Sequence, residues 1–421
     1  MKLDKKGKRY LVASILIVII VCSFFVVFKV ITDKKEDELP VERYEPNDVL
    51  INEFDYSFLK LEASDKNLIY SPLSIKYALS MLREGANGSS KKELDDILSE
   101  TSLTKYTNIK DVLSLANSVF IRETYKDHVK DSYLKSIKDL YDAEVFYDKF
   151  ENASNINSWI SEKTFNIINN MVSDTYFENP NLEMILVNAL AIDMEWDNPF
   201  EGEKTYSSDF TKSNGDKVSV AMMNQTTDSK KYKYYQDDDY TLVSMPLKKY
   251  QDTELEFVAV LPKNENLKDF VTDNEFEENL KSLLEKMNNV SNKKVNISIP
   301  RFEYDYSIEL AKDMNLLGVL DIFSPSKADF SRISDTGLYV SDMLHKADIK
   351  FSERGIKAAA ATVIFMTDKS EIVEPEEIEY LRFDKPFIYI IKDAKTDEVW
   401  FVGSVNEPLL WEDAKNDYKY E

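Results

Sequence analysis

The chain has 421 residues and a formal net charge of −23, because 76 acidic residues outnumber 53 basic ones, and this balance disfavours nucleic-acid binding. A single cysteine excludes an intrachain disulfide, so stability must come from core burial, for which the chain is long enough. Only two histidines, His128 and His345, are available to a Ser-His-Asp enzyme, and no phosphate-loop or metal-site spacing occurs. We therefore expect no enzymatic activity, no cofactor and no metal.

The N-terminus has the pattern of a membrane segment. Basic residues precede an uncharged apolar run from Leu11 to Phe28, which is long enough to span a bilayer core. The basic residues favour a cytoplasmic N-terminus. The basic residues are Lys2, Lys5, Lys6, Lys8 and Arg9.

This pattern predicts a cytoplasmic segment over residues 1–10, a transmembrane signal anchor over 11–31 and a charged linker over 32–48. The remainder would then be extracellular on a single-pass protein of the cell membrane. Secretion after signal cleavage is the alternative, although no Ala-x-Ala-like site ends the run. Cys22 follows Val21, which is a poor residue for a lipoprotein signal. The charged linker disfavours burial of the run in a core.

Beyond residue 48 the chain mixes helical and strand patterns without repeats. Residues Ser158 to Met171 and Asn274 to Met287 have helical spacing, and His128 is expected to be exposed on a helix. These patterns predict one α+β domain over residues 49–409 and a C-terminal tail over 410–421. The predicted strands are Glu254 to Pro262, Ile297 to Phe302 and Phe387 to Ile391.

A glycine hinge followed by alanines is the most informative segment. Gly355 is one of only 9 glycines and precedes four consecutive alanines. Glycine supplies backbone freedom, and alanine loses almost no side-chain entropy on ordering. An Ala-rich helix is the alternative, but Pro375 follows and the connection to the strand at Phe387 is long. Loops of this length are usually functional or disordered.

The segment resembles the reactive-centre loop hinge of the serpins. The resemblance extends from about Val49 to Pro408 through spaced motifs that include Asn67 to Ser74, Pro300 to Phe302 and Leu344 to Ala347. Ile356 departs from the pattern, because the family prefers Thr or Ser there. The other hinge residues match: Glu353, Arg354, Gly355, Lys357, Ala358, Ala359, Ala360, Ala361 and Thr362.

The resemblance implies a serpin fold, α+β, with three β-sheets, eight or nine helices and an exposed reactive-centre loop at about 353–382. It implies a monomeric serine protease inhibitor that acts by suicide-substrate trapping. The family register from the hinge glutamate places the bait bond at Lys369–Ser370, and a lysine there suits trypsin-like proteases. Because the loop is long, cleavage after Met366 or Asp368 is an alternative. After cleavage, residues 355–368 would insert into the main sheet.

The resemblance also implies a sheet-opening cluster, of which Trp196 would lie at the top of the sheet. Taken singly, Ser74 is a plausible helix cap, and the tryptophan and histidine could be ordinary core residues. A non-inhibitory serpin acting as a surface binding protein is the alternative function, and Ile356 is the argument for it. The cluster residues are Ser71, Ser74, Asn188, His345 and Trp196.

Overall fold

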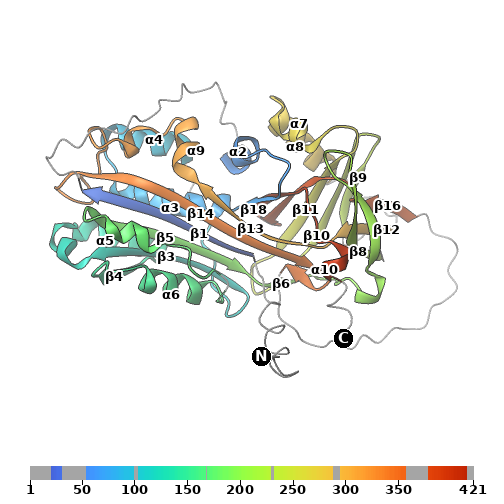
Figure 1. Ribbon diagram of the computed structural model, residues 1–421, viewed down its shortest axis with the longest axis horizontal. Helices are drawn as coiled ribbons and strands as arrows, with labels where there is room; N and C mark the ends of the chain where they lie inside the picture. Colours follow the sequence, from blue (N-terminus) through green and yellow to red (C-terminus); the bar gives the residue numbers. More distant parts are fainter. Residues whose placement is uncertain are drawn as a thin grey trace, which may run out of the picture.

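The computed structural model describes residues 20–30, 54–98, 103–166, 168–228, 232–287, 294–356 and 378–414. Within them, three sheets are surrounded by helices α2 to α10, as Figure 1 shows. The α+β class and the three sheets predicted from the sequence are confirmed.

The large sheet has the order β4-β3-β5-β1-β14-β15-β6, and β13 also pairs with β14. In Figure 1, β1 in blue lies between β5 in green and β14 in orange, although these strands are far apart in the sequence. The strands are β4 (Glu144–Asp148), β3 (Leu113–Arg122), β5 (Leu182–Ile192), β1 (Ile20–Val30), β14 (Leu338–Ser352), β15 (Gly355–Ile356), β6 (Met194–Glu195) and β13 (Phe302–Glu309).

The second sheet has six strands and the third has four. From one edge of the second sheet to the other, the strands are β2 (Leu68–Tyr70), β18 (Val399–Val405), β17 (Phe387–Asp393), β11 (Leu255–Pro262), β10 (Tyr240–Pro246) and β9 (Lys233–Gln236). Across the third sheet they are β16 (Ile378–Arg382), β12 (Lys294–Pro300), β8 (Lys217–Asp228) and β7 (Tyr206–Thr211).

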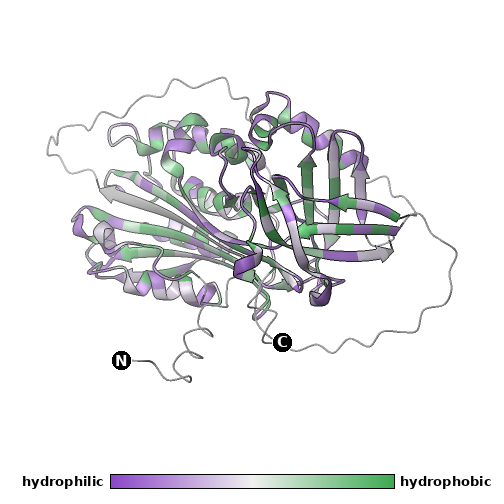
Figure 2. Ribbon diagram, turned by 45° about the vertical axis from the view of Figure 1, so that its right-hand side comes forward, coloured by the Kyte–Doolittle hydropathy of each residue, from purple (hydrophilic) through white to green (hydrophobic). Residues whose placement is uncertain are grey.

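The helices cover the outer faces of these sheets, and α6 and α3 pack against opposite faces of the large sheet beside β5. Figure 2 shows apolar residues concentrated along the strands, where most of the core lies, and polar residues more frequent on the outer helices. The helices are α2 (Phe54–Leu61), α3 (Pro72–Gly85), α4 (Gly88–Leu98), α5 (Asp131–Tyr141), α6 (Ser154–Lys163), α7 (Leu267–Thr272), α8 (Phe276–Met287), α9 (Leu310–Leu316) and α10 (Trp411–Ala414).

The first residues of α3 follow the rules of helix initiation. Ser71 is the N-cap, and its hydroxyl accepts a hydrogen bond from the backbone N–H of Ser74, while Pro72 occupies the first turn. The predicted cap at Ser74 is therefore wrong by one turn. Ser74 is instead free to direct its hydroxyl toward the sheet.

Several predicted elements differ in their bounds. The predicted helix at 158–171 is α6, which ends at Lys163 because Phe165 and Asn166 adopt left-handed backbone angles. The predicted strand at 297–302 is two strands, β12 and β13, with Arg301 between them. His128 is exposed at the end of a short 3₁₀ helix.

Strand β1 corrects the prediction for the apolar N-terminal run. Residues 20–30 are a central strand of the large sheet, so the predicted transmembrane helix over 11–31 is wrong for this part, and residues 11–19 lie outside the described ones. The run is rich in Ile, Val and Phe, which suit a pleated strand as well as a membrane helix. No helix among the described residues is long and apolar enough to cross a membrane.

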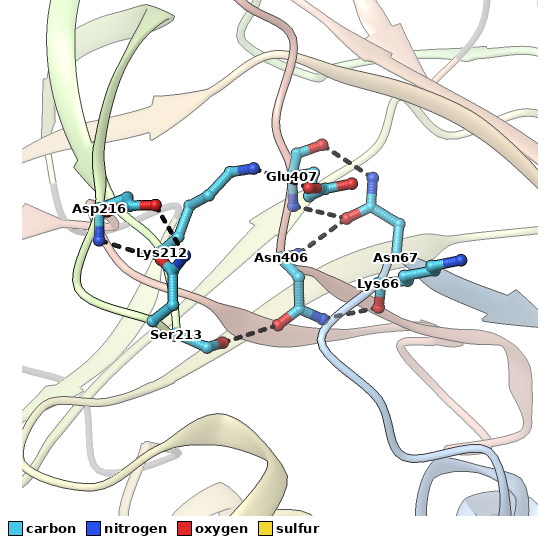
Figure 3. A network of polar contacts seen from close by, with 8 residues as sticks. Lys66, Asn67, Lys212, Ser213, Asp216, Asn406 and Glu407 are labelled. Carbon is cyan, nitrogen blue, oxygen red and sulfur yellow. Dashed lines mark hydrogen bonds and ion pairs between the residues drawn. The ribbon is translucent and has the colours of Figure 1, made fainter.

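A polar network joins two motif segments from opposite ends of the domain (Figure 3). The side-chain oxygen of Asn67 accepts hydrogen bonds from the backbone N–H groups of Asn406 and Glu407, both at 2.8 Å. Gly403 approaches the same region closely, because a Cβ there would lie 2.4 Å from the carbonyl oxygen of Leu68. The start of β2 is thus held against the end of β18.

Candidate functional site

The first residues of the glycine hinge are already part of the large sheet. Gly355 and Ile356 form β15, which pairs with the end of β14 on one side and with β6 on the other. A Cβ on residue 355 would lie 2.1 Å from the carbonyl oxygen of Met194, so only glycine fits. Ile356 is fully buried in the apolar core between the large sheet and the six-stranded sheet.

Glu353 anchors the turn that precedes β15. Its Oε1 accepts a hydrogen bond of 2.7 Å from the hydroxyl of Thr205, and its Oε2 lies 3.6 Å from Nε of Arg301. Both charged side chains are largely buried, at 13% and 7% exposed. The sequence analysis did not identify Arg301 as the partner of Glu353. Its position in the motif Pro300 to Phe302 was the one sequence feature that pointed to it.

Trp196 holds the other side of the same turn. Its indole Nε1 donates to the carbonyl oxygen of Ser352 at 2.9 Å, and its backbone N–H donates to the carbonyl oxygen of Arg354 at 2.8 Å. Its ring meets that of Phe351 edge-on, with 5.1 Å between the centroids. Trp196 therefore lies at the hinge end of the sheet, apart from the four polar residues grouped with it.

Those four polar residues meet between α3 and the large sheet. The Ser74 hydroxyl donates to Oδ1 of Asn188 on β5, and the backbone N–H of Ser71 donates to Nε2 of His345 on β14 at 3.0 Å. All four residues are buried. One of them is on α3, one is the N-cap of that helix and two are on the strands β5 and β14, so the cluster spans the region beneath β1.

Burial lowers the pKa of His345 to about 3. The imidazole is therefore neutral at physiological pH and accepts the hydrogen bond from Ser71. Sequence reasoning missed Asn117 on β3, whose Oδ1 accepts from Nδ2 of Asn188 at 2.8 Å. Asn117 extends the polar cluster one strand further across the sheet.

Both strands of the cluster border β1. Phe24 of β1 is the register partner of His345 on β14 and of Asn188 on β5. The hinge pairs with the C-terminal end of β14, and the polar cluster lies nearer the middle of the same strand, beneath β1. The remaining predicted site residues lie outside the described ones: Lys357, Ala358, Ala359, Ala360, Ala361, Thr362, Lys369 and Ser370.

Comparisons with known proteins point to one family. A family model described as serpin (serine protease inhibitor) matches residues 53–408. An uncharacterized serpin-like protein of Methanosarcina mazei is 30% identical over 365 residues, covering 82% of each chain. Tengpin, a thermophilic serpin solved in its native state, is 26% identical with a TM-score of 0.68, covering 84% of this chain and 92% of its own.

A structure of thyroxine-binding globulin in complex with thyroxine is equally similar. It has a TM-score of 0.68 and 26% identity, covering 85% of this chain and 96% of its own. The matched chains thus include one whose name states a ligand rather than a protease.

Proposed function

Because the chain belongs to the serpin family, we propose that it inhibits a trypsin-like serine protease by suicide-substrate trapping. The protease serine attacks the carbonyl carbon of Lys369, the bond to Ser370 breaks, and an acyl-enzyme remains. The freed loop then inserts into the large sheet and distorts the bound protease, so that deacylation becomes slow. The protein acts as an inhibitor and not as a catalyst.

The register of β15 is the observation that carries this proposal. Ile356 pairs with Phe351 on β14 and with Met194 on β6. In an antiparallel ladder, each residue further along one strand meets one residue further back on the other. Continued without a bulge, this ladder would bring Lys369 opposite Leu338, the first residue of β14.

The other neighbouring strand supports the same end point. The ladder from Met194 would bring Asp368 opposite Leu182, the first residue of β5. Cleavage after Lys369 would therefore release a loop segment just long enough to pair with β5 and β14 as far as their first residues. A cut after Met366 would leave the first residues of both strands without partners.

The alternation of buried residues supports the same insertion. Ala358 would face Ile349 and Ile192, and Ala360 would face Ala347 and Leu190. All four partners are fully buried in one apolar cluster. Small or apolar loop residues at these positions suit that face, since alternate residues of a strand share a face.

The energy of insertion is sufficient for trapping. Once β1 has left the sheet, insertion of residues 357–368 would add about a dozen ladder positions at roughly 0.5–1.5 kcal/mol each, so the total is on the order of 10 kcal/mol. This is comparable to the whole stability of a domain. Ile356 does not slow the later steps if it is already inserted, because its burial in β15 precedes cleavage.

A non-inhibitory binding role is the second candidate. The observation that favours it is β1, which fills the gap between β5 and β14. For location, the basic and apolar N-terminus supports export of the domain.

The test mixes the full chain with trypsin. Trapping yields a covalent complex that survives denaturing gel electrophoresis, and mass spectrometry of the released C-terminal peptide should find Ser370 at its start. Loop cleavage without any complex, both in this chain and in variants that destabilise β1, would favour the binding role.

A further inference from the structure

We propose that residues 20–30 are a built-in competitor of the reactive-centre loop, so that the loop can insert only after β1 leaves the sheet. This inference rests on the proposed function. It makes the described structure an autoinhibited form: a loop cut in this form traps no protease, and trapping comes only from molecules in which β1 has left the sheet.

The competition follows from shared partners. Val21 pairs with Asp348 on β14 and with Ala191 on β5. Extension of β15 would give Ala359 the same two partners. The two neighbouring strands therefore assign the same place to Val21 and to Ala359, independently of each other.

The polarity of the two segments also agrees. β1 runs antiparallel to both β5 and β14, as β15 does to β6 and β14. β1 begins opposite Ile192 and Asp348, just beyond the residues that β15 pairs. It therefore continues the path of the hinge in the same direction.

The occupied length leaves no place for the loop. β1 pairs along β5 as far as Leu182 and along β14 as far as Leu338. These are the residues at which an inserted loop would end. Because each backbone group of a central strand needs its partners, two strands cannot occupy this place together.

The competitor has the stronger strand composition. Its sequence IVCSFFVVFKV consists mostly of β-branched and aromatic residues, whereas the loop has four consecutive alanines directly after Lys357. Most of these residues also belong to the apolar run from Leu11 to Phe28, which is long enough to span a bilayer. One segment cannot do both, so a chain held in a membrane by this run would have an empty place in its sheet.

A disulfide tests where the segment lies. The register places Cys22, the only cysteine of the chain, opposite Ala347 and Leu190. Both kinds of antiparallel pair have Cα separations within the range that a disulfide accepts. Oxidation of full-length Ala347→Cys or Leu190→Cys with oxidised glutathione should form the crosslink, detected by mass spectrometry. Ala191→Cys is the control, because residue 191 is opposite Val21.

The crosslink also tests competition. Oxidised Ala347→Cys should be cleaved by trypsin without forming a complex, and reduction should restore the behaviour of the reduced protein. Val26→Pro removes a ladder donor from β1, and we expect it to lower the number of molecules cleaved per trypsin trapped by at least about fivefold. Ile17→Pro is the matched control, because it alters the same apolar run outside β1.

The outcomes separate this inference from the proposed function. Failure of both cysteine pairs to crosslink, or measurable trapping that is equal in Val26→Pro and the unmodified chain, would overturn the competition. If the crosslink forms and no variant traps trypsin, inhibition is wrong. Competition is then measured by the melting temperature after loop cleavage, which should rise in Val26→Pro and stay constant in the oxidised crosslinked protein.

Discussion

Nε2 of His345 accepts a hydrogen bond from the backbone N–H of Ser71, 3.0 Å away, and so joins β14 to the first turn of α3. The two residues are 274 positions apart in the sequence. The bond requires a neutral imidazole, and it lies beneath β1, which separates β5 from β14. Protonation of this histidine should therefore break the hydrogen bond and lower the free energy of unfolding.

The pH dependence of stability should show this effect. Burial lowers the pKa of His345 to about 3 in the fold, against about 6.5 in the unfolded chain. Between these pH values the unfolded chain binds a proton on His345 and the folded chain does not. The contribution of the neutral histidine to the free energy of unfolding is therefore fully present above pH 6.5 and is lost as the pH falls toward 3. From pH 7 to 5, the loss should be about 2 kcal/mol.

The measurement compares this protein with His345→Gln in urea unfolding. Glutamine can accept the same hydrogen bond but does not titrate. The difference in free energy of unfolding should shift in favour of the glutamine variant by about 2 kcal/mol between pH 7 and 5. A difference that stays constant over this range would contradict a neutral, buried histidine.

The bait residue should decide which protease is inhibited. Lys369→Glu should lower the second-order rate constant of trypsin inhibition by at least about a hundredfold, because the specificity pocket of trypsin holds a carboxylate. Lys369→Arg should stay within about threefold, since it keeps the charge. An unchanged rate constant in the glutamate variant would show that the bait bond lies elsewhere in the loop.

A charge in the inserting face should turn the inhibitor into a substrate. Ala360→Arg would bring a guanidinium against Ala347 and Leu190, both fully buried. An unpaired buried charge costs several kcal/mol, so the number of molecules cleaved per trypsin trapped should rise at least about tenfold. Ile372→Arg, beyond the bait bond, is the control. Undiminished trapping by Ala360→Arg would refute the insertion register.

The ion pair of Glu353 and Arg301 should stabilise the hinge more than a surface pair does. Arg301→Ala leaves a largely buried carboxylate and should lower the free energy of unfolding by about 2–4 kcal/mol. Combined with Glu353→Gln in a double-mutant cycle, the coupling should exceed about 1 kcal/mol. Lys204→Ala breaks the exposed pair with Glu201 and should cost under about 1 kcal/mol. Equal losses for both pairs would contradict the role of burial.

Short-range features were predictable from the residues alone. The strand at Phe387 and the helix ending at Met287 appear with nearly the expected bounds, because their patterns are strong and local. The resemblance also indicated the three sheets and the partners of the polar cluster. Arg301 and Asn117 were missed as members of the site, since their partners lie on other strands and no local pattern names them.

Order along the chain was enough to indicate the family, the hinge at Gly355 and a candidate bait lysine, because each depends on neighbours in the sequence. The location of residues 20–30 was decided in three dimensions. A run of Ile, Val and Phe is equally suited to lipid and to the interior of a sheet. Whether the run forms a membrane helix or a strand depends on a vacant strand position between β5 and β14. These strands are more than a hundred residues away in the sequence, so the position exists only in the folded domain.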